Sequence, residues 1–322
     1  MGKDANSGGV VLADVGGTNV RFAITRDGAL GPITHLRVAD YPQFSDALAT
    51  FLEGQAQPAS VRRAVFGAAG FIEGGRCALT NNPWVVSASE LRDRFGFSQV
   101  QIVNDFEAIA WSLPRLTSID LQRIGGQGAK LGAPMVVLGP GTGLGLAAYL
   151  HTRDGGLVVS GEGGHASLAS SSLREDAIVA RLRSQYGHAS AERVLSGDGL
   201  KNIYHAIAAL DAVSVPERSA AEITQSALDG SCPTSRSAVD AFCSFLGSVA
   251  GNLALSFGAR GGVYIAGGIV AHIRDYLLKS EFRSRFEAKG RMRRYLQAIP
   301  AYLILHDDPA FLGLQVLAVT ER

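Results

Sequence analysis

Residues 10–22 read VVLADVGGTNVRF, and this stretch decides the fold that the chain predicts. A buried-type apolar run comes first, then an aspartate, two glycines and a threonine, and then a second apolar run. The pattern predicts a strand, a tight turn and another strand. Gly16 and Gly17 allow backbone conformations and a close backbone approach that a side chain would block. Such a turn, with Asp14 at the end of its first strand, is suited to holding a phosphate and a metal ion.

A related design returns at residues 136–149, VVLGPGTGLGLAAY. Its alternating glycines suggest a dinucleotide-binding fingerprint, but that fingerprint opens a helix directly after its strand. Here the apolar strand pattern resumes over residues 144–150. We therefore interpret Gly141, Thr142 and Gly143 as a second phosphate-binding turn.

Outward from these turns, the apolar patterns recur in outline, which predicts an internally duplicated α/β fold. Each turn lies in a run of three antiparallel strands, followed by further strands and helices. The predicted strands are residues 10–14, 20–25, 33–38, 63–70, 99–103, 136–138, 144–150, 157–160, 262–266 and 302–305. The predicted helices are residues 44–52, 106–113, 220–228, 239–257 and 310–319, one that a capping box of Ser87 and Glu90 begins, one after Gly268, and two more, separated at Gly197, in residues 187–207. Gly247 and Gly251 should permit close packing of the helix of residues 239–257, and Asp308 with Pro309 should cap and begin the last helix.

Composition bounds the class of protein. The chain has 322 residues, 47% hydrophobic and 18% charged, which predicts two compact domains. The formal net charge is +1 and the cations are dispersed except in residues 289–294, KGRMRR, so we expect no nucleic-acid partner. We interpret these arginines as a solvated helix face.

The three cysteines, Cys77, Cys232 and Cys243, are far apart and lack metal-binding spacing, which favours a reduced cytoplasm. The polar start MGKDANSG does not resemble a signal peptide. Residues 131–150 and 241–259 are free of charge and near membrane-spanning length, but turns and serines interrupt them. We expect buried strands and a buried helix, and no membrane partner.

Asn104 and Asp105 follow a predicted strand and open a predicted helix. The helix dipole stabilises a carboxylate at that place. Asp105 could simply cap the helix, or it could accept a proton as a general base. Gly267 and Gly268 follow another predicted strand, where they either let a nucleotide lie close to the backbone or merely admit the next helix.

Seven motifs, in order along nearly the whole chain, resemble those of the bacterial glucokinases in the actin-like and hexokinase-like ATPase superfamily. They are ADVGGTNVR at 13–21, TNNPW at 80–84, NDFEA at 104–108, GPGTGLG at 139–145, EGGH at 162–165, SAERVLSG at 190–197 and AGGI at 266–269. The wider family includes members with a cysteine-rich zinc motif after the EGGH-like segment, or with an added N-terminal DNA-binding domain. Neither pattern is found here, which favours the zinc-free branch.

The resemblance implies a two-lobed fold of duplicated ribonuclease-H-like domains, with ATP and Mg²⁺ between the lobes. It also implies phosphorylation of glucose at its 6-hydroxyl, a glycolytic role and a homodimer. We expect a small α/β domain of residues 1–114 with 308–322, and a large α/β domain of residues 115–307.

The same resemblance assigns roles to individual residues. Asp105 is expected to be the catalytic base, and Asp14 the magnesium contact. Glucose would contact Asn104, Asp105, Glu162, His165 and Glu192, with one of Asn81 and Asn82 bordering it and Trp84 as a packing wall. ATP would contact Ala13, Asp14, Val15, Gly16, Gly17, Thr18, Gly141, Thr142, Gly143, Gly267 and Gly268.

Other functions stay open at this point. A kinase for mannose or glucosamine would use the same machinery, and so would one that takes ADP or polyphosphate as donor. A non-catalytic sugar sensor on the same scaffold would be expected to lose Asp14, Asp105 or a Gly/Thr turn, and all of these are present. An actin-like or chaperone-like ATPase acting on protein would not need the EGGH and SAER motifs.

Overall fold

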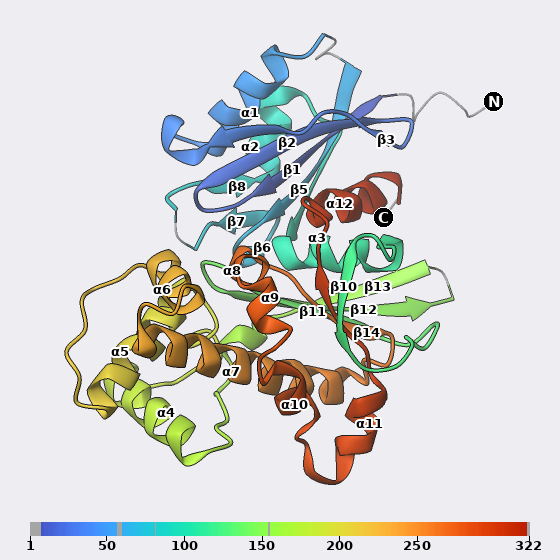
Figure 1. Cartoon of the computed structure of the whole chain (residues 1–322). Helices are drawn as coiled ribbons and strands as arrows, with labels where there is room; N and C mark the ends of the chain where they lie inside the picture. Colours follow the sequence, from blue (N-terminus) through green and yellow to red (C-terminus); the bar gives the residue numbers. More distant parts are fainter. Residues whose placement is uncertain (1–7, 57–59, 81, 154, 321–322) are drawn as a thin grey trace. The chain divides into compact units, whose positions relative to one another are not determined.

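The computed structural model describes residues 8–56, 60–80, 82–153 and 155–320. Its contacts divide the chain into two compact units (Figure 1). Unit 1 comprises Met1–Leu116 with His306–Arg322, and unit 2 comprises Thr117–Leu305. Unit 2 is therefore inserted into the sequence of unit 1. We propose that the two units correspond to the two domains expected from the sequence.

Unit 1 is built on a mixed sheet that begins with the opening stretch of sequence. The strands lie in the order β3-β2-β1-β5-β9, with β4 also paired to β2. β1 pairs antiparallel with β2 and parallel with β5, which pairs parallel with β9. The strands are β1 Gly9–Val15, β2 Asn19–Arg26, β3 Ala29–Leu30, β4 Thr34–Arg37, β5 Val61–Ala68 and β9 Gln99–Asn104, and a small separate sheet holds β6 Ile72–Glu73, β7 Arg76–Ala78 and β8 Val85–Ser87.

Helices cover both faces of the unit 1 sheet (Figure 1). The helices are α1 Phe44–Glu53, α2 Ala88–Phe95, α3 Asp105–Ser112 and α12 Pro309–Val319. Side chains of β1 alternate between the faces, so that Val11, Ala13 and Val15 pack with α1 and α2. The other face packs against α3 and α12. Asp14 lies one residue out of phase with Ala13 and so belongs to the α3 and α12 face.

α12 and α3 pack at unusually close range. A Cβ added at Gly313 of α12 would lie 1.7 Å from the carbonyl oxygen of Ala108 in α3. Glycine is therefore required where these helices touch. Because α12 follows unit 2 in the sequence but packs on unit 1, this contact fastens the returning chain to unit 1.

Unit 2 repeats the sheet of unit 1. Its strands lie in the order β10-β15-β14-β11-β12-β13, with β11, β12 and β13 forming an antiparallel run and β11, β14 and β15 running parallel. The same path, an antiparallel run joined to parallel strands, describes β4-β2-β1-β5-β9 in unit 1. The predicted duplicated α/β fold is confirmed. The strands are β10 Leu121–Gly125, β11 Met135–Pro140, β12 Leu144–Thr152, β13 Gly155–Ser160, β14 Gly262–Ile265 and β15 Ala301–Ile304.

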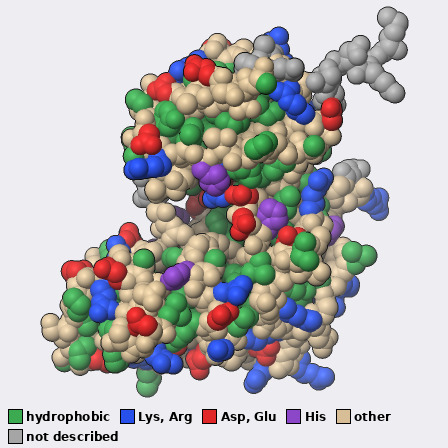
Figure 2. All heavy atoms as spheres, turned by 45° about the horizontal axis from the view of Figure 1, so that its top comes forward, with side chains coloured by type: hydrophobic (Ala, Val, Ile, Leu, Met, Phe, Trp, Pro, Cys, Tyr) green, Lys and Arg blue, Asp and Glu red, His purple; other side chains and the backbone are tan. Residues whose placement is uncertain are grey.

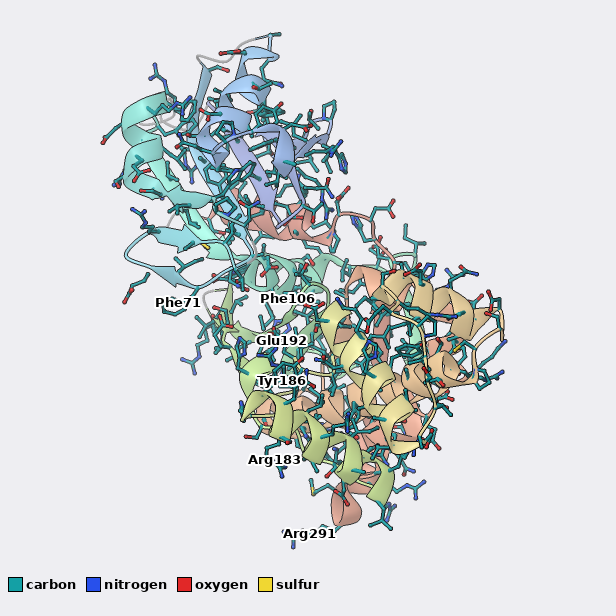
Figure 3. The ribbon with its side chains drawn as sticks, turned by 90° about the vertical axis from the view of Figure 1, so that its left-hand side faces the viewer. Phe71, Phe106, Arg183, Tyr186, Glu192 and Arg291 are labelled. Carbon is teal, nitrogen blue, oxygen red and sulfur yellow. The ribbon has the colours of Figure 1, made fainter. Side chains whose placement is uncertain are left out.

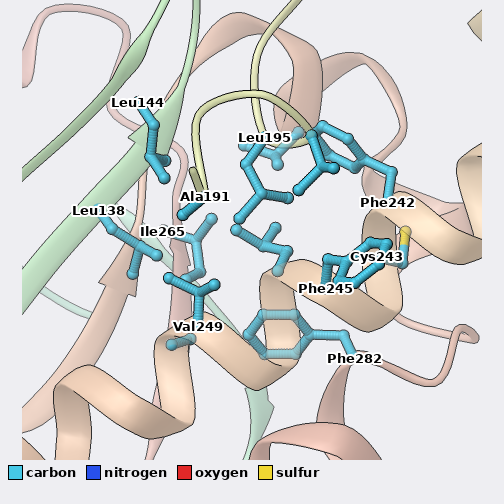
Figure 4. Packing of buried hydrophobic residues seen from close by; sticks show 14 of the residues in the cluster. Leu138, Leu144, Ala191, Leu195, Phe242, Cys243, Phe245, Val249, Ile265 and Phe282 are labelled. Carbon is cyan, nitrogen blue, oxygen red and sulfur yellow. The ribbon is translucent and has the colours of Figure 1, made fainter. Parts of the chain in front are cut away.

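The core of unit 2 lies between this sheet and its helices (Figure 4). The helices are α4 Leu173–Tyr186, α5 Gly197–Leu210, α6 Ala220–Leu228, α7 Pro233–Phe257, α8 Gly268–His272, α9 Arg274–Leu277, α10 Phe282–Glu287 and α11 Arg293–Ala298. On α7, a Cβ at Gly247 would lie 2.2 Å from the Phe282 carbonyl oxygen. The expectation that this glycine permits close helix packing is confirmed.

Among the described residues, α7 is the one helix long and apolar enough to cross a membrane by length and composition. Its most apolar window is 67% buried inside the unit, as a core helix is. In KGRMRR, Arg291 (Figure 3), Arg293 and Arg294 are exposed, as expected. Lys289 is half-buried and donates to the Ser248 carbonyl and to Asn252. Figure 2 shows basic and acidic side chains interspersed on the face that it draws.

The predicted helix before Gly197 is wrong. Residues 190–196 were predicted to be part of a helix, yet they form a bridge, bends and turns, whereas α4, which was not predicted, covers residues 173–186. The reason is an extended pairing. Leu168 and Ala191 donate their amides to Ala189 and Ala166, respectively, and Glu192 donates to Gly164. These bonds align the segment with the EGGH motif, while α5 begins at Gly197 as predicted.

Candidate functional site

Asp14 and Asp105 lie at the same edge of the unit 1 sheet. Asp14 is in register with Gly67 of β5, and Gly67 is in register with Val103 of β9. A Cβ at Gly67 would lie 3.8 Å from the Asp105 Cα. In open α/β sheets, ligands bind outside the carboxyl ends of the parallel strands. Both carboxylates are therefore placed where a ligand of unit 1 is expected.

The turn after β1 is a tight hairpin. The Gly16 amide donates to the Asn19 carbonyl at 3.1 Å, and the Thr18 carbonyl accepts from the Val38 amide. No backbone bond is found for the Gly17 and Thr18 amides among the described residues. The Gly16 amide is thus used by the turn itself, and the next two amides remain for an anion.

Asp14 shares a charged cluster with Arg21 and Asp308. Arg21, opposite Asp14 in the β1–β2 register, places its guanidinium 3.4 Å from the Asp14 carboxylate and 2.5 Å from that of Asp308. Burial raises the pKa of Asp14, partly offset by Arg21, and Asp308 raises it further. A partly buried carboxylate held beside one cation is oriented rather than free to turn. Sequence reasoning missed both partners.

The Asp308 side chain was expected to cap the terminal helix by accepting a hydrogen bond from its backbone, and this expectation is wrong. α12 does begin with Pro309, but no side-chain cap bond forms from Asp308. Its carboxylate instead reaches Arg21, 287 positions away in the chain. A local cap pattern carries no information about so distant a partner, although the ion pair satisfies the carboxylate better than an amide would.

At the end of β9, Asn104 caps α3. Its Oδ1 accepts from the amides of Phe106 at 2.9 Å and Glu107 at 3.4 Å, and its Nδ2 donates to the Gly70 carbonyl at 3.4 Å. Asp105 is the first residue of the helix, and its Oδ1 accepts from the Phe106 amide at 2.9 Å. Asn104 is therefore the N-cap of this helix, and the Asp105 carboxylate shares one of the amides that Asn104 binds.

The TNNPW segment is tied to the first turn. The Asn82 Nδ2 donates to the Gly17 carbonyl at 3.2 Å, and the Asn82 Oδ1 accepts from the Trp84 amide at 2.7 Å. Trp84 is buried and its indole donates to the Tyr41 carbonyl. Asn82 therefore supports the turn, and Trp84 packs in the core of unit 1. Asn81 lies outside the described residues.

In unit 2, the second turn is closed by its own backbone. The Gly141 amide donates to the Gly143 carbonyl at 2.8 Å, and the Gly141 carbonyl accepts from the Gly197 amide at 2.9 Å. A Cβ at Gly141 would meet no protein atom within 4 Å, whereas one at Gly143 would lie 2.5 Å from the Glu192 Oε2. The backbone at Gly141 is thus open to a ligand, and Gly143 is required by Glu192.

Glu162, His165 and Glu192, predicted to act together, lie together in unit 2. The Glu192 Oε1 lies 4.0 Å from the His165 Nδ1, and the Glu162 Oε2 lies 3.9 Å from the His165 Nε2. The side chains of Glu162 and His165 are 60% and 62% exposed, and that of Glu192 is 31% exposed. Two carboxylates and an imidazole in reach of solvent form a set of directional donors and acceptors.

Glu192 is fixed by its neighbours in the chain. The adjacent Ala191 and the nearby Leu195 are buried in the unit 2 core (Figure 4). The next residue, Arg193, lays its guanidinium over the Tyr186 ring at 4.0 Å, and Figure 3 shows Tyr186 at the end of α4 together with Glu192. The backbone from which the Glu192 side chain extends is therefore held in place, although it lies on a loop.

The glycine pair lies beside the second turn. Gly267 has a φ of 106°, and a Cβ there would lie 2.4 Å from the Pro140 carbonyl oxygen. A Cβ at Gly268, the first residue of α8, would meet nothing within 4 Å. β14 and β11 are parallel neighbours, so both glycine segments leave the same edge of the sheet. The open backbone at Gly141 and Gly268 fits a nucleotide.

The residues of the first turn are also suited to Mg²⁺ that is bound together with a nucleotide, as in kinases. No group of three or more His, Cys, Asp and Glu suited to a metal is found among the described residues. Mg²⁺ bound with a nucleotide needs one or two carboxylates, since phosphate oxygens and water complete its shell. Asp14, beside the amides of Gly17 and Thr18, meets this requirement.

Comparison with known proteins identifies the family. The family model described as Glucokinase matches residues 11–321. The chain is 46% identical over 316 residues to the glucokinase of Paramagnetospirillum magneticum, covering 97% of this chain and 98% of that protein. The chain belongs to the glucokinase family. The match runs through every motif discussed above, from the first turn to α12.

Solved glucokinase structures share the fold. The crystal structure of a glucokinase from an Antarctic psychrotroph has a TM-score of 0.85 and 34% identity, covering 96% of this chain and 98% of that one. A ROK family glucokinase from Streptomyces griseus, in complex with glucose and AMPPNP, has a TM-score of 0.63 at 19% identity, with 96% and 99% coverage. The actin-like, hexokinase-like fold expected from the motifs is confirmed.

Proposed function

We propose that this glucokinase transfers the γ-phosphoryl group of ATP to the 6-hydroxyl of glucose, with Asp105 as the general base. One observation carries the assignment of Asp105. Asn104 already supplies the cap of α3, so the fold does not need a carboxylate at the next position for that purpose. A carboxylate at the carboxyl ends of the parallel strands lies where it can meet a bound ligand.

Phosphoryl transfer asks little covalent work of a protein. The enzyme aligns the attacking oxygen with the γ-phosphate and stabilises the negative charge that spreads over the phosphoryl oxygens. The Asp105 carboxylate would accept the proton of the 6-hydroxyl as the new P–O bond forms and the bond to ADP breaks. Asn104, held by its cap bonds, would fix the direction in which Asp105 leaves the strand.

The glycine turns would hold ATP. Gly17 and Thr18 offer their amides to the β- and γ-phosphates, with Ala13, Val15 and Gly16 forming the hairpin that presents them. Gly141, Thr142 and Gly143 would form the second turn, with Gly267 and Gly268 alongside the adenosine and α-phosphate. Asp14 would contact Mg²⁺, which screens the phosphate charge when it is bound.

Glucose would be read by the carboxylates and the imidazole of unit 2. Glu162 and Glu192 accept hydrogen bonds from sugar hydroxyls, and His165 between them can donate or accept. Buried or fixed polar groups reject a substrate that leaves them unpaired. Glu192, less exposed than Glu162 and bound to the backbone, is the more discriminating of the two.

Replacing the proposed base tests the mechanism. Asp105→Asn keeps the shape of the side chain but removes its basicity, so kcat should fall about 10²–10⁴-fold while glucose affinity is kept. The control is Glu107→Gln, which removes an acid from the same first helical turn. Steady-state kinetics and calorimetric titration of glucose measure the two quantities. Near-normal turnover of Asp105→Asn would sink the assignment.

A second experiment separates glucose phosphorylation from its rivals. The purified protein is assayed with glucose, mannose and glucosamine, each with ATP, ADP and polyphosphate. We expect the highest kcat/KM for glucose with ATP, and no ATP hydrolysis above background without a sugar. Preference for another hexose or donor would revise the substrate, and binding of glucose without turnover would indicate a sensor.

We further propose that the protein acts in glycolysis in the cytoplasm as a homodimer. The three cysteines are unpaired, and Cys77 and Cys243 are buried, which suits a reducing compartment. Sedimentation at micromolar concentration tests the dimer, because a monomer has half the mass.

A further inference from the structure

Glu192 touches both halves of the machinery proposed for unit 2. Its Oε2 accepts from the Leu144 amide at 2.9 Å, directly after the glycine turn. Its Oε1 faces His165 on the side of the proposed sugar residues. One planar carboxylate therefore has one oxygen on the nucleotide turn and the other toward the sugar.

The backbone around Glu192 strengthens this link. The Glu192 amide donates to the Gly164 carbonyl, inside the EGGH motif. The Glu192 carbonyl accepts from the Ser196 hydroxyl, which also caps α5, and the Gly197 amide at the start of that helix bonds to Gly141. The turn, the EGGH segment and the start of α5 are thus joined through one residue.

We propose that Glu192 couples sugar binding to nucleotide binding by holding the turn of residues 141–143 with one carboxylate oxygen and the sugar with the other. A sugar hydroxyl bound to Oε1 fixes the plane of the carboxylate, and this plane fixes the Leu144 amide and the turn before it. The proposal rests on the proposed function of these residues. It adds that Glu192 is a positioning residue for the nucleotide as well as a contact for the sugar.

Coupling of this kind is reciprocal. If glucose improves the affinity for AMPPNP by a given factor, AMPPNP must improve the affinity for glucose by the same factor. We expect a factor of about five or more in the unmodified protein, the lower end of typical coupling. Isothermal titration of AMPPNP with Mg²⁺, with and without saturating glucose, measures it.

A matched pair of variants separates coupling from sugar contact. Glu192→Ala should weaken AMPPNP binding to the sugar-free protein about fivefold or more and bring the coupling factor close to one. Glu162→Ala removes an acid from the same set that has no bond to the turn, so it should weaken glucose binding and leave sugar-free AMPPNP binding unchanged. Glu192→Gln keeps an oxygen for Leu144 and should restore AMPPNP binding but not glucose binding.

A second pair of variants tests the coupling by changing the turn of residues 141–143. Gly143→Ala places a methyl group 2.5 Å from the present position of the Glu192 Oε2 and should displace it. Glucose affinity of the nucleotide-free protein should therefore fall, although Gly143 is not a sugar contact. Gly141→Ala, in the same turn with nothing within 4 Å, should leave that glucose affinity unchanged. This pair also serves if Glu192→Ala does not fold.

The outcomes distinguish the two proposals. Equal AMPPNP affinities for Glu192→Ala and the unmodified protein, or equal glucose affinities for the two turn variants, overturn the coupling. Unchanged glucose binding in both Glu192→Ala and Glu162→Ala overturns the proposed sugar site instead.

Discussion

Asp14 lies in an environment that opposes its charge. Burial raises its pKa above the ordinary 3.8, and Arg21 offsets only part of this effect. A carboxyl group whose pKa is raised in the folded state favours folding fully below the unfolded pKa, and this contribution is lost as the pH rises through the folded pKa. Above pH 3.8 the raised pKa of Asp14 therefore costs stability, because the unfolded chain releases this proton more readily than the folded protein.

Asp14→Asn should accordingly make the magnesium-free protein more stable at pH 7 while abolishing turnover. The gain should shrink as the pH falls toward 3.8, because the carboxyl group becomes protonated in both states. Chemical denaturation at pH 7 and pH 5 measures it, with Asp93→Asn on the exposed face of α2 as a control. A less stable Asp14→Asn protein would show that the pair with Arg21 outweighs the cost of burial.

At the residue scale, the sequence predicted the roles that depend on neighbouring residues, but not the contacts between residues far apart in the chain. The place of Asp14 before a glycine turn and of Asp105 at a helix start follow from neighbouring residues. Arg21 and Asp308 were missed because their ion pair joins residues far apart in the chain. An arginine in a strand otherwise rich in buried residues was the one available signal.

At the scale of elements, helix contacts depend on a few glycines. Gly313→Ala would gain about 0.5–1 kcal/mol in helix propensity. It would also place a methyl group 1.7 Å from the backbone carbonyl of Ala108, and overpacking of this kind costs about 1–3 kcal/mol or more. We expect net destabilisation.

Urea unfolding measures the change, and Gly128→Ala is the control because a Cβ there would meet nothing within 4 Å. A Gly313→Ala protein as stable as the control would mean that α12 and α3 separate at little cost.

The bounds of a helix were predicted correctly where the spacing of its apolar side chains determines them. α6 begins and ends at the predicted residues, 220–228, because its apolar face repeats at helical spacing. Residues 190–196 have a similar composition but pair with the EGGH segment, and this tertiary pairing outweighs helix propensity. The position of Glu192 on a loop whose side chain bonds to Leu144, directly after the turn of residues 141–143, could therefore not be predicted.

At the scale of the molecule, the thiols provide a measure of folding in both units. Burial raises the pKa of Cys77 to about 11, with Asp105 adding to the effect, and raises that of Cys243 to about 12. The pKa of Cys232 is lowered, with its bonds to Ser235 outweighing burial. Iodoacetamide at pH 8 should therefore modify Cys232 first in the native protein, as measured by mass spectrometry of peptides.

Because Cys77 belongs to unit 1 and Cys243 to unit 2, denaturant should expose each thiol when its own unit opens. Equal rates for all three cysteines in native buffer would contradict the burial described here.

The path of the chain through unit 1 has a consequence for synthesis on the ribosome. β1 emerges early, but α12, which covers α3 and brings Asp308 to Arg21, emerges only after all of unit 2. Unit 2 is a continuous segment, so it can form its internal contacts as soon as it has been translated. Unit 1 must wait with the helix that begins at Asp105 uncovered on one side. The unit that carries Asp105, the proposed base, is thus completed only at the end of translation, so a truncated chain that ends within unit 2 lacks a finished unit 1.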